Sequence, residues 1–253
     1  MKELGIYIHI PFCKQKCIYC DFISYVNKEE EIEEYIKYLI YEIEDVAKII
    51  KLNKKEIIIK TIYIGGGTPS FIHEKYIAKI IECIFDNYKV RKDVEITIEV
   101  NPGTVTKEKL QTYKINGINR LSIGMQSTNN NILKQLGRIH NFQQFLNSYN
   151  LARELKFDNI NIDLMINLQN QNIDEELDTI LSLNPEHLSV YSLIIEKDTP
   201  IYNMVKNKKY KLPKEEVERE AYWKIKIKLE ENRIHTLWNI KLLQKTVLNQ
   251  NII

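Results

Sequence analysis

Residues 9–20 read His-Ile-Pro-Phe-Cys-Lys-Gln-Lys-Cys-Ile-Tyr-Cys and directly follow an apolar run that predicts a β-strand. The three cysteines of this loop, Cys13, Cys17 and Cys20, have C-x3-C-x2-C spacing. Cysteine thiolates in such clustered spacings hold the irons of a cubane 4Fe-4S cluster. Because three thiolates serve four irons, one iron stays open to a small molecule. The sequence therefore predicts a 4Fe-4S cluster with an open iron.

Two other interpretations of the cysteine loop are open. A structural zinc site would need a fourth ligand, such as His9 or the distant Cys83. Three unliganded buried thiols are the second alternative, although Lys14, Gln15 and Lys16 make the loop polar. Cys83 lies within a helical pattern of isoleucines, and we expect it to be a small buried hydrophobe.

Composition narrows the class of protein. The chain has 253 residues, 44% of them hydrophobic, which is enough for one large core or two small ones without disulfides. Its 36 basic and 34 acidic side chains give a net charge of +2, too balanced to predict a nucleic-acid partner. No apolar run approaches the roughly 20 residues of a membrane span, and the first residues leave no room for a signal peptide. We therefore expect a cytoplasmic protein with no transmembrane segment.

Short β-rich runs alternate with longer helical patterns, which predicts repeated βα units and a parallel sheet in an α/β protein. Strands are expected at residues 5–10, 58–64, 94–100, 119–125, 159–165 and 187–193. Helices are expected at residues 29–50, 73–88, 106–115, 141–155, 172–183 and 214–231. Six such units predict a partial (β/α)6 barrel.

Apolar and polar side chains alternate within the predicted strands. Thr97 and Glu99, for example, oppose an apolar set formed by Ile96, Ile98 and Val100. We interpret the apolar face as packing against helices and the polar face as lining a lumen that holds a ligand. An antiparallel sheet with one solvated face is the alternative, although the long helical crossovers favour parallel strands.

A glycine-rich turn, Gly65-Gly66-Gly67-Thr68-Pro69, follows the second predicted strand. Without Cβ atoms, its backbone can approach a ligand closely. A triple glycine alone is also consistent with a flexible turn.

Four polar residues fall near the ends of later strands. Glu99 and Asp163 lie near the carboxyl ends of strands three and five, the edge where function collects in α/β barrels. Gln126 ends strand four, and Arg138 on the segment after it is suited to hold a carboxylate through two parallel hydrogen bonds. The alternatives are a carboxylate satisfied by a loop amide and ordinary solvated polar residues.

These motifs, in this order, resemble the radical S-adenosylmethionine (SAM) superfamily and, within it, the oxygen-independent coproporphyrinogen III oxidase family. The matching stretches are residues 7–13, 65–70, 99–103, 121–127, 136–138 and 161–165, and the resemblance runs from about residue 5 to residue 235. It implies that Cys13, Cys17 and Cys20 bind a 4Fe-4S cluster whose electron cleaves SAM to a 5'-deoxyadenosyl radical. The SAM contacts that it implies are Tyr7, Tyr19, Gly66, Gly67, Thr68, Glu99, Gln126, Arg138 and Asp163.

The family contains true oxidases, which decarboxylate two propionates of coproporphyrinogen III, and a haem chaperone branch, which passes haem to acceptor proteins. True oxidases have a further cysteine two residues after the third ligand, where this chain has Phe22. The chaperone branch is the better match. It implies haem or a porphyrin, a reductant protein and a haem acceptor as partners. It also implies that the radical SAM core could cleave SAM. A coproporphyrinogen oxidase, another radical SAM enzyme and a truncated inactive remnant are the alternatives.

The resemblance also predicts the domain organisation. Residues 1–195 would form the partial barrel and residues 196–235 a helical extension, while the tail 236–253 does not match the family. We expect a chain truncated at its C-terminus, without the C-terminal domain and its haem motif. Where the family has two turn glycines after Asp163, this chain has Asn167 and Asn170. Because Asn tolerates a left-handed backbone, we expect the turn to survive at a cost of about 1–3 kcal/mol if strained.

Overall fold

A computed structural model describes residues 2–52 and 56–232 of the chain as six parallel strands in one sheet, in the order β1-β2-β3-β4-β5-β6. The strands are β1 (Lys2–Ile10), β2 (Ile57–Gly66), β3 (Val90–Val100), β4 (Arg120–Gln126), β5 (Ile160–Ile166) and β6 (His187–Ser192). Every neighbouring pair is parallel. The predicted parallel (β/α)6 arrangement is therefore confirmed, and the antiparallel alternative is excluded.

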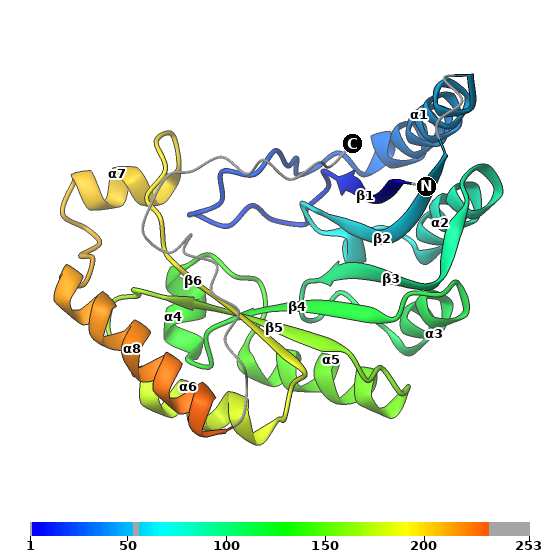
Figure 1. Cartoon of the computed structure of the whole chain (residues 1–253). Coiled ribbons are helices and arrows are strands. Elements are labelled where there is room, and N and C mark those ends of the chain that lie inside the picture. Colours follow the sequence, from blue (N-terminus) through cyan, green and yellow to red (C-terminus); the bar gives the residue numbers. More distant parts are fainter. Residues whose placement is uncertain (1, 53–55, 233–253) are drawn as a thin grey trace.

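Helices connect the strands along the outer side of the sheet, while the cysteine loop after β1 crosses the opposite, open side (Figure 1). The helices are α1 (Ile32–Leu52), α2 (Glu74–Asn87), α3 (Lys107–Ile115), α4 (Asn130–Gln135), α5 (Phe142–Glu154), α6 (Ile173–Ser182), α7 (Pro200–Lys206) and α8 (Glu215–Glu231). Single 3-10 turns precede α1 at Glu29–Glu31 and α2 at Pro69–Phe71. The short helices α4 and α7 were not predicted from the sequence.

Local capping explains where several helices begin. The side chain of Thr106 accepts a hydrogen bond from Lys109 N at the start of α3. Asn141 and Gln144 form a reciprocal capping box at the start of α5. At α7, Thr199 caps a helix whose first residue is Pro200. Each cap satisfies backbone N–H groups that the first helical turn leaves unpaired.

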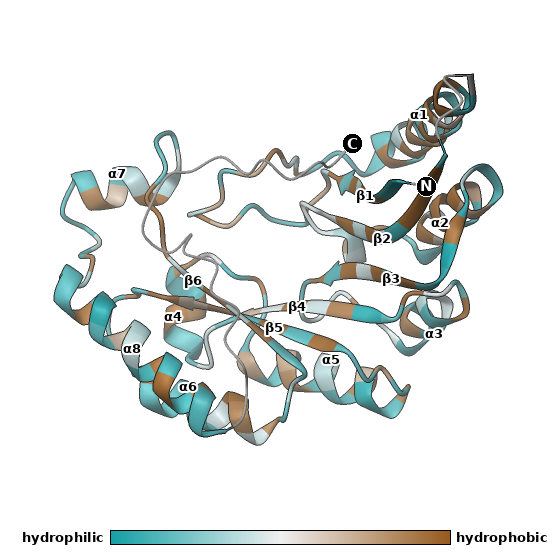
Figure 2. Cartoon of the chain, in the orientation of Figure 1, coloured by the Kyte–Doolittle hydropathy of each residue, from teal (hydrophilic) through white to brown (hydrophobic). Residues whose placement is uncertain are grey.

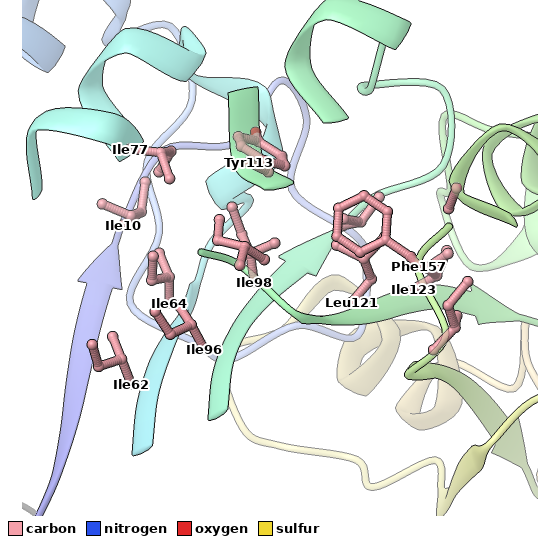
Figure 3. Packing of buried hydrophobic residues seen from close by; sticks show 14 of the residues in the cluster. Ile10, Ile62, Ile64, Ile77, Ile96, Ile98, Tyr113, Leu121, Ile123 and Phe157 are labelled. Atoms are coloured by element: carbon pink, nitrogen blue, oxygen red, sulfur yellow. The ribbon is translucent and has the colours of Figure 1, made fainter. Parts of the chain in front are cut away.

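The core lies between the sheet and its helices. The buried apolar side chains of the central strands recur mainly at every second residue, and most are isoleucine, as β-strand packing favours. Figure 2 shows brown, apolar stretches in the strands and alternating brown and teal bands along the helices, as expected for helices with one apolar face. Figure 3 shows Ile64 and Ile98 packed near Ile77 of α2 and Tyr113 of α3. The alternation predicted from the sequence thus turns the apolar face toward the helices and leaves the polar face to the lumen.

A second, smaller apolar cluster lies where the strands end. Met165 of β5 and Leu193 after β6 pack there with Ile132 and Leu136 from the α4 region and with Ile201 of α7. Ile201 N also donates a hydrogen bond to Ile18 O in the cysteine loop, at 3.0 Å. This cluster therefore supports the cysteine loop from below. The predicted domain boundary near residue 195 stays a prediction, and the tail 236–253 lies outside the described residues.

None of the helices in the described part of the chain combines the length and apolar character needed to cross a lipid bilayer.

Candidate functional site

A cavity of about 530 Å³ lies at the carboxyl ends of the strands, beneath the cysteine loop. This volume falls within the range of about 300–1,000 Å³ that small-molecule sites occupy. The predicted site residues that line it are Cys13, Cys17, Cys20, Tyr19, Gly66, Gly67, Thr68, Glu99, Gln126, Arg138 and Asp163. The fold therefore gathers nearly all of the predicted site around one cavity.

The cysteine loop is fixed by backbone hydrogen bonds at both ends. Cys13 N donates to Tyr25 O at 2.9 Å, and Ile18 N donates to Leu136 O at 3.2 Å. Cys13 is buried and accepts a hydrogen bond from Thr68 Oγ1 at 3.4 Å, whereas Cys17 and Cys20 are partly exposed to the cavity. Burial raises the pKa of the Cys13 and Cys20 thiols, and a bound metal would stabilise their thiolate forms.

The three thiols do not form a preformed site for a single metal ion. Among residues 2–52 and 56–232, no three His, Cys, Asp or Glu side chains are gathered closely enough to hold one metal ion. Three ligands on different irons of a cubane do not have to converge on one point. The geometry thus gives the zinc alternative no support. Cys83 is buried in α2, as predicted, and its thiol lies near Ile40 O rather than near the loop.

The glycine turn packs closely against the cysteine loop. A Cβ atom on Gly67 would lie 3.0 Å from Cys13 Sγ and equally close to two backbone oxygens, so a side chain there would fill the space next to the thiol. Gly66 has φ +114°, and a Cβ atom on it would meet the His9 ring at 2.6 Å. Only glycine fits these positions, because the turn packs directly against the cysteine loop and the end of β1.

Glu99 reaches the cavity from the end of β3. Its carboxylate accepts hydrogen bonds from Tyr63 Oη at 2.8 Å and from Gly66 N at 3.0 Å. Burial raises the pKa of Glu99, and these two hydrogen bonds oppose the rise. The alternative that Glu99 is a carboxylate satisfied by a backbone amide is thus met by Gly66 N. The carboxylate nevertheless also borders the cavity, where it can accept a hydrogen bond from a ligand amine.

Asp163 lies on the lumen side of β5 and lines the same cavity as Glu99. It accepts a hydrogen bond from Asn161 Nδ2 at 2.7 Å and a longer one from Ser122 Oγ at 3.4 Å. Burial, followed by the negative charge of Glu99, raises the pKa of Asp163 to about 7. The group is therefore poised to change protonation state near neutral pH.

Arg138 extends from the segment after α4 into the cavity. Its Nη1 donates to Cys17 Sγ at 3.5 Å and to Tyr19 Oη at 3.3 Å, and its Nη2 donates to Gly124 O at 2.9 Å. Nη2 also donates to the side chain of Asn101. Among the described residues it forms no ion pair with a carboxylate, and its Nε has no hydrogen-bond partner. The guanidinium is thus held in place with capacity left for a negatively charged ligand.

Gln126, at the end of β4, has an unusual backbone. Its φ is +70°, and Ser127 N donates to Met125 O at 3.0 Å, closing a three-residue turn around it. A positive φ in a residue other than glycine costs about 1–3 kcal/mol and often marks functional sites. Gln126 is only 4% exposed, and its side-chain oxygen accepts a hydrogen bond from Tyr191. The solvated-residue alternative is therefore wrong for Gln126.

Of the predicted SAM contacts, all within the described residues, only Tyr7 does not line the cavity. His9 Nε2 must donate to Ile23 O at 2.9 Å, so Nδ1 accepts from Tyr7 Oη at 3.0 Å. The Tyr7 ring also stacks on Tyr63, with ring centroids 6.1 Å apart. Its contact with SAM stays a prediction.

Sequence reasoning missed other cavity residues, among them Tyr63, Asn101, Ser122 and Tyr191. Tyr63 and Ser122 occupy polar positions of their strands, so the period-two pattern carried the signal for both. The position of Asn101 in the cavity, in contrast, depends on the path of the loop after β3, which no local sequence pattern predicts.

The matches with known proteins agree with this geometry. The family model described as the Radical SAM superfamily matches residues 7–183, and the chain belongs to this superfamily. A protein named heme chaperone HemW from Bacillus subtilis is 39% identical over 233 residues, and one from Escherichia coli is 40% identical over 202 residues. These matches cover 90% and 79% of this chain but only 60% and 53% of the relatives.

A solved structure, coproporphyrinogen III oxidase from Escherichia coli, resembles this fold with a TM-score of 0.79 at 26% identity. The likeness covers 90% of this chain and 52% of that protein. The resemblance predicted from the motifs is thus confirmed. A 4Fe-4S cluster and SAM are the cofactors typical of the superfamily.

Proposed function

We propose that this chain is the SAM-binding part of a haem chaperone. The observation that carries the proposal is the cavity bordered by Cys13, Cys17 and Cys20 on one side and by Glu99, Asp163 and Arg138 on the other. The identity of about 39% with proteins named heme chaperones supports the choice of branch.

The three thiolates would hold a 4Fe-4S cluster, which when bound supplies an electron and an open iron to the amino and carboxylate groups of SAM. Glu99 would accept a hydrogen bond from the amino group, held in place by Tyr63 and Gly66. Arg138 would donate hydrogen bonds to the carboxylate of SAM, because no carboxylate among the described residues is paired with its guanidinium. Asp163, when ionised, would accept hydrogen bonds from hydroxyl groups of the nucleoside.

Haem would bind at the outer rim of the same cavity. Phe22 and Ile194 both border the cavity, and they are 61% and 63% exposed. Exposed apolar side chains beside a polar site are suited to the flat face of a macrocycle. We further propose a cytoplasmic location, a reductant protein that supplies electrons and an acceptor protein that receives the haem.

Anaerobic reconstitution of the full chain tests the proposal. We expect about four irons and four sulfides per chain, a haem titration that saturates in the absorbance spectrum, and a change in the spectrum of the reduced cluster when SAM is added. Replacement of Phe22 by Ser should weaken haem binding and leave the iron content unchanged. Zinc in place of iron, or no saturable haem binding, would contradict the proposal.

A second candidate is coproporphyrinogen III oxidase activity, favoured by the fold likeness to that enzyme. Phe22, in place of the further cysteine of true oxidases, favours the chaperone instead. Anaerobic incubation with coproporphyrinogen III, SAM and a strong reductant separates the two, because only an oxidase releases CO2.

A further inference from the structure

Glu176 of α6 is a buried carboxylate placed behind the cavity. It is 2% exposed and forms no ion pair within the described residues. Its Oε1 accepts hydrogen bonds from the hydroxyl of Ser127 and from Thr128 N at 3.2 Å. Its Oε2 accepts from Gln171 Nε2 at 2.7 Å. A buried carboxylate is costly unless hydrogen-bonded in this way, so the network must hold it in one position.

The network ties two loops together at the end of the sheet. Gln171 Nε2 also donates to Met165 O at 2.8 Å, so Glu176 and Gln171 connect the end of β5 to the residues after β4. Ser127 Oγ in turn accepts a hydrogen bond from Asn129 N at 3.0 Å, at the start of α4. The segment that follows Gln126 is therefore held at two successive residues.

Gln126 needs such support because of its backbone. A left-handed φ in a residue with a side chain persists only where the surrounding structure fixes it. Tyr191 donates to the side-chain oxygen of Gln126, so the amide is oriented with its nitrogen left as the donor. That nitrogen has no hydrogen-bond partner among the described residues, and Gln126 lines the cavity.

We propose that Glu176 is a positioning residue for SAM, which acts by holding Gln126 in its left-handed turn with the amide nitrogen directed to the ligand. This inference rests on the proposed SAM site. Glu176 touches neither the cavity nor the ligand, and its effect passes through Ser127 and Thr128.

The test compares SAM binding by the reconstituted full chain and by Glu176→Gln. The amide of the variant offers one acceptor oxygen in place of two, so either Gln171 or the pair Ser127 and Thr128 loses its acceptor. In both cases the connection between the end of β5 and the residues after β4 is broken. We expect the dissociation constant for SAM to rise about three- to tenfold, the size of effect that the net contribution of about one hydrogen bond gives. Glu175→Gln is the matched control, because Glu175 lies on the same helical turn and is exposed.

A double-mutant cycle with Gln126→Asn separates positioning from general damage. Asn tolerates positive φ but its amide is one methylene shorter. If Glu176 acts through Gln126, Glu176→Gln should have no further effect on SAM affinity in the Gln126→Asn background. An equal loss of affinity in both backgrounds would overturn the inference.

Hydrogen exchange of the SAM-free protein provides the second measurement. We expect faster exchange at the amides of residues 127–129 in Glu176→Gln and unchanged exchange in Glu175→Gln. If both the exchange rates and the SAM affinity were unaltered in Glu176→Gln, the role of Glu176 would be refuted while the proposed function would stand. Wild-type protein that binds no SAM would instead overturn the proposed function.

Discussion

Replacement of Asp163 by Asn should change how the stability of the protein depends on pH. In the folded state, burial and the charge of Glu99 raise the pKa of Asp163 to about 7, against an ordinary value of 3.8. The folded state thus keeps a proton that the unfolded chain releases above pH 4. The stability contributed by this group is fully present below pH 4 and is lost as pH rises through 7.

The magnitude follows from the shift. Between pH 5 and pH 8 the unfolded chain is deprotonated at this position, while the folded chain holds its proton until about pH 7. Each pH unit over which only the folded state is protonated is worth about 1.4 kcal/mol, so wild type should lose about 2–3 kcal/mol to this group. The asparagine of the variant carries no titrating proton, and its side-chain oxygen can still accept from Asn161 and Ser122.

Urea unfolding of wild type and Asp163→Asn at pH 5 and pH 8 measures the effect. We expect the variant to gain about 2–3 kcal/mol relative to wild type over this range. The exposed Asp158 provides the control, and Asp158→Asn should follow wild type. If the unfolding free energies of Asp163→Asn and wild type stayed parallel from pH 5 to pH 8, the raised pKa would be refuted.

Three further predictions concern the site and the fold. Cys17→Ser should abolish iron and sulfide incorporation during anaerobic reconstitution, whereas Cys83→Ser, in α2, should retain both in an elemental assay. Gly66→Ala should prevent detectable SAM binding in equilibrium dialysis, because its Cβ would lie 2.6 Å from an imidazole atom at φ +114°; unchanged binding would refute the close packing. Asn167→Gly should raise the free energy of unfolding, measured by urea denaturation, by about 0.5–1 kcal/mol, because Asn167 has φ +64° and a buried side-chain oxygen without a hydrogen-bond partner. Asn147→Gly, inside α5, is the control and should lower the free energy of unfolding.

The strands and long helices could be predicted because each is long enough to show its period. The same alternation predicts the lumen-facing residues, among them Glu99 and Asp163. The helices α4 and α7 span only six and seven residues, too short for a helical period to be distinguished from a loop. Their absence from the sequence prediction is therefore a consequence of length.

Two features of the site depend on tertiary structure and could not be predicted from the local sequence. The contact between Arg138 and Cys17 depends on how two distant loops meet above the sheet. The left-handed turn at Gln126 is imposed by neighbours on other elements, since glutamine has no intrinsic preference for it. Asn167 and Asn170 differ in this respect: both have positive φ, as the sequence predicted from the preference of asparagine.

The two hydrogen bonds of Ile18, to Leu136 O and from Ile201 N, set an order of events in biogenesis. During synthesis, the cysteines leave the ribosome long before the segments that anchor their loop. Until residue 201 has emerged and packed, Ile18 lacks one of its two backbone hydrogen bonds, and the thiols on either side of it are less firmly held. We therefore expect loading of iron and sulfide to follow completion of the sheet.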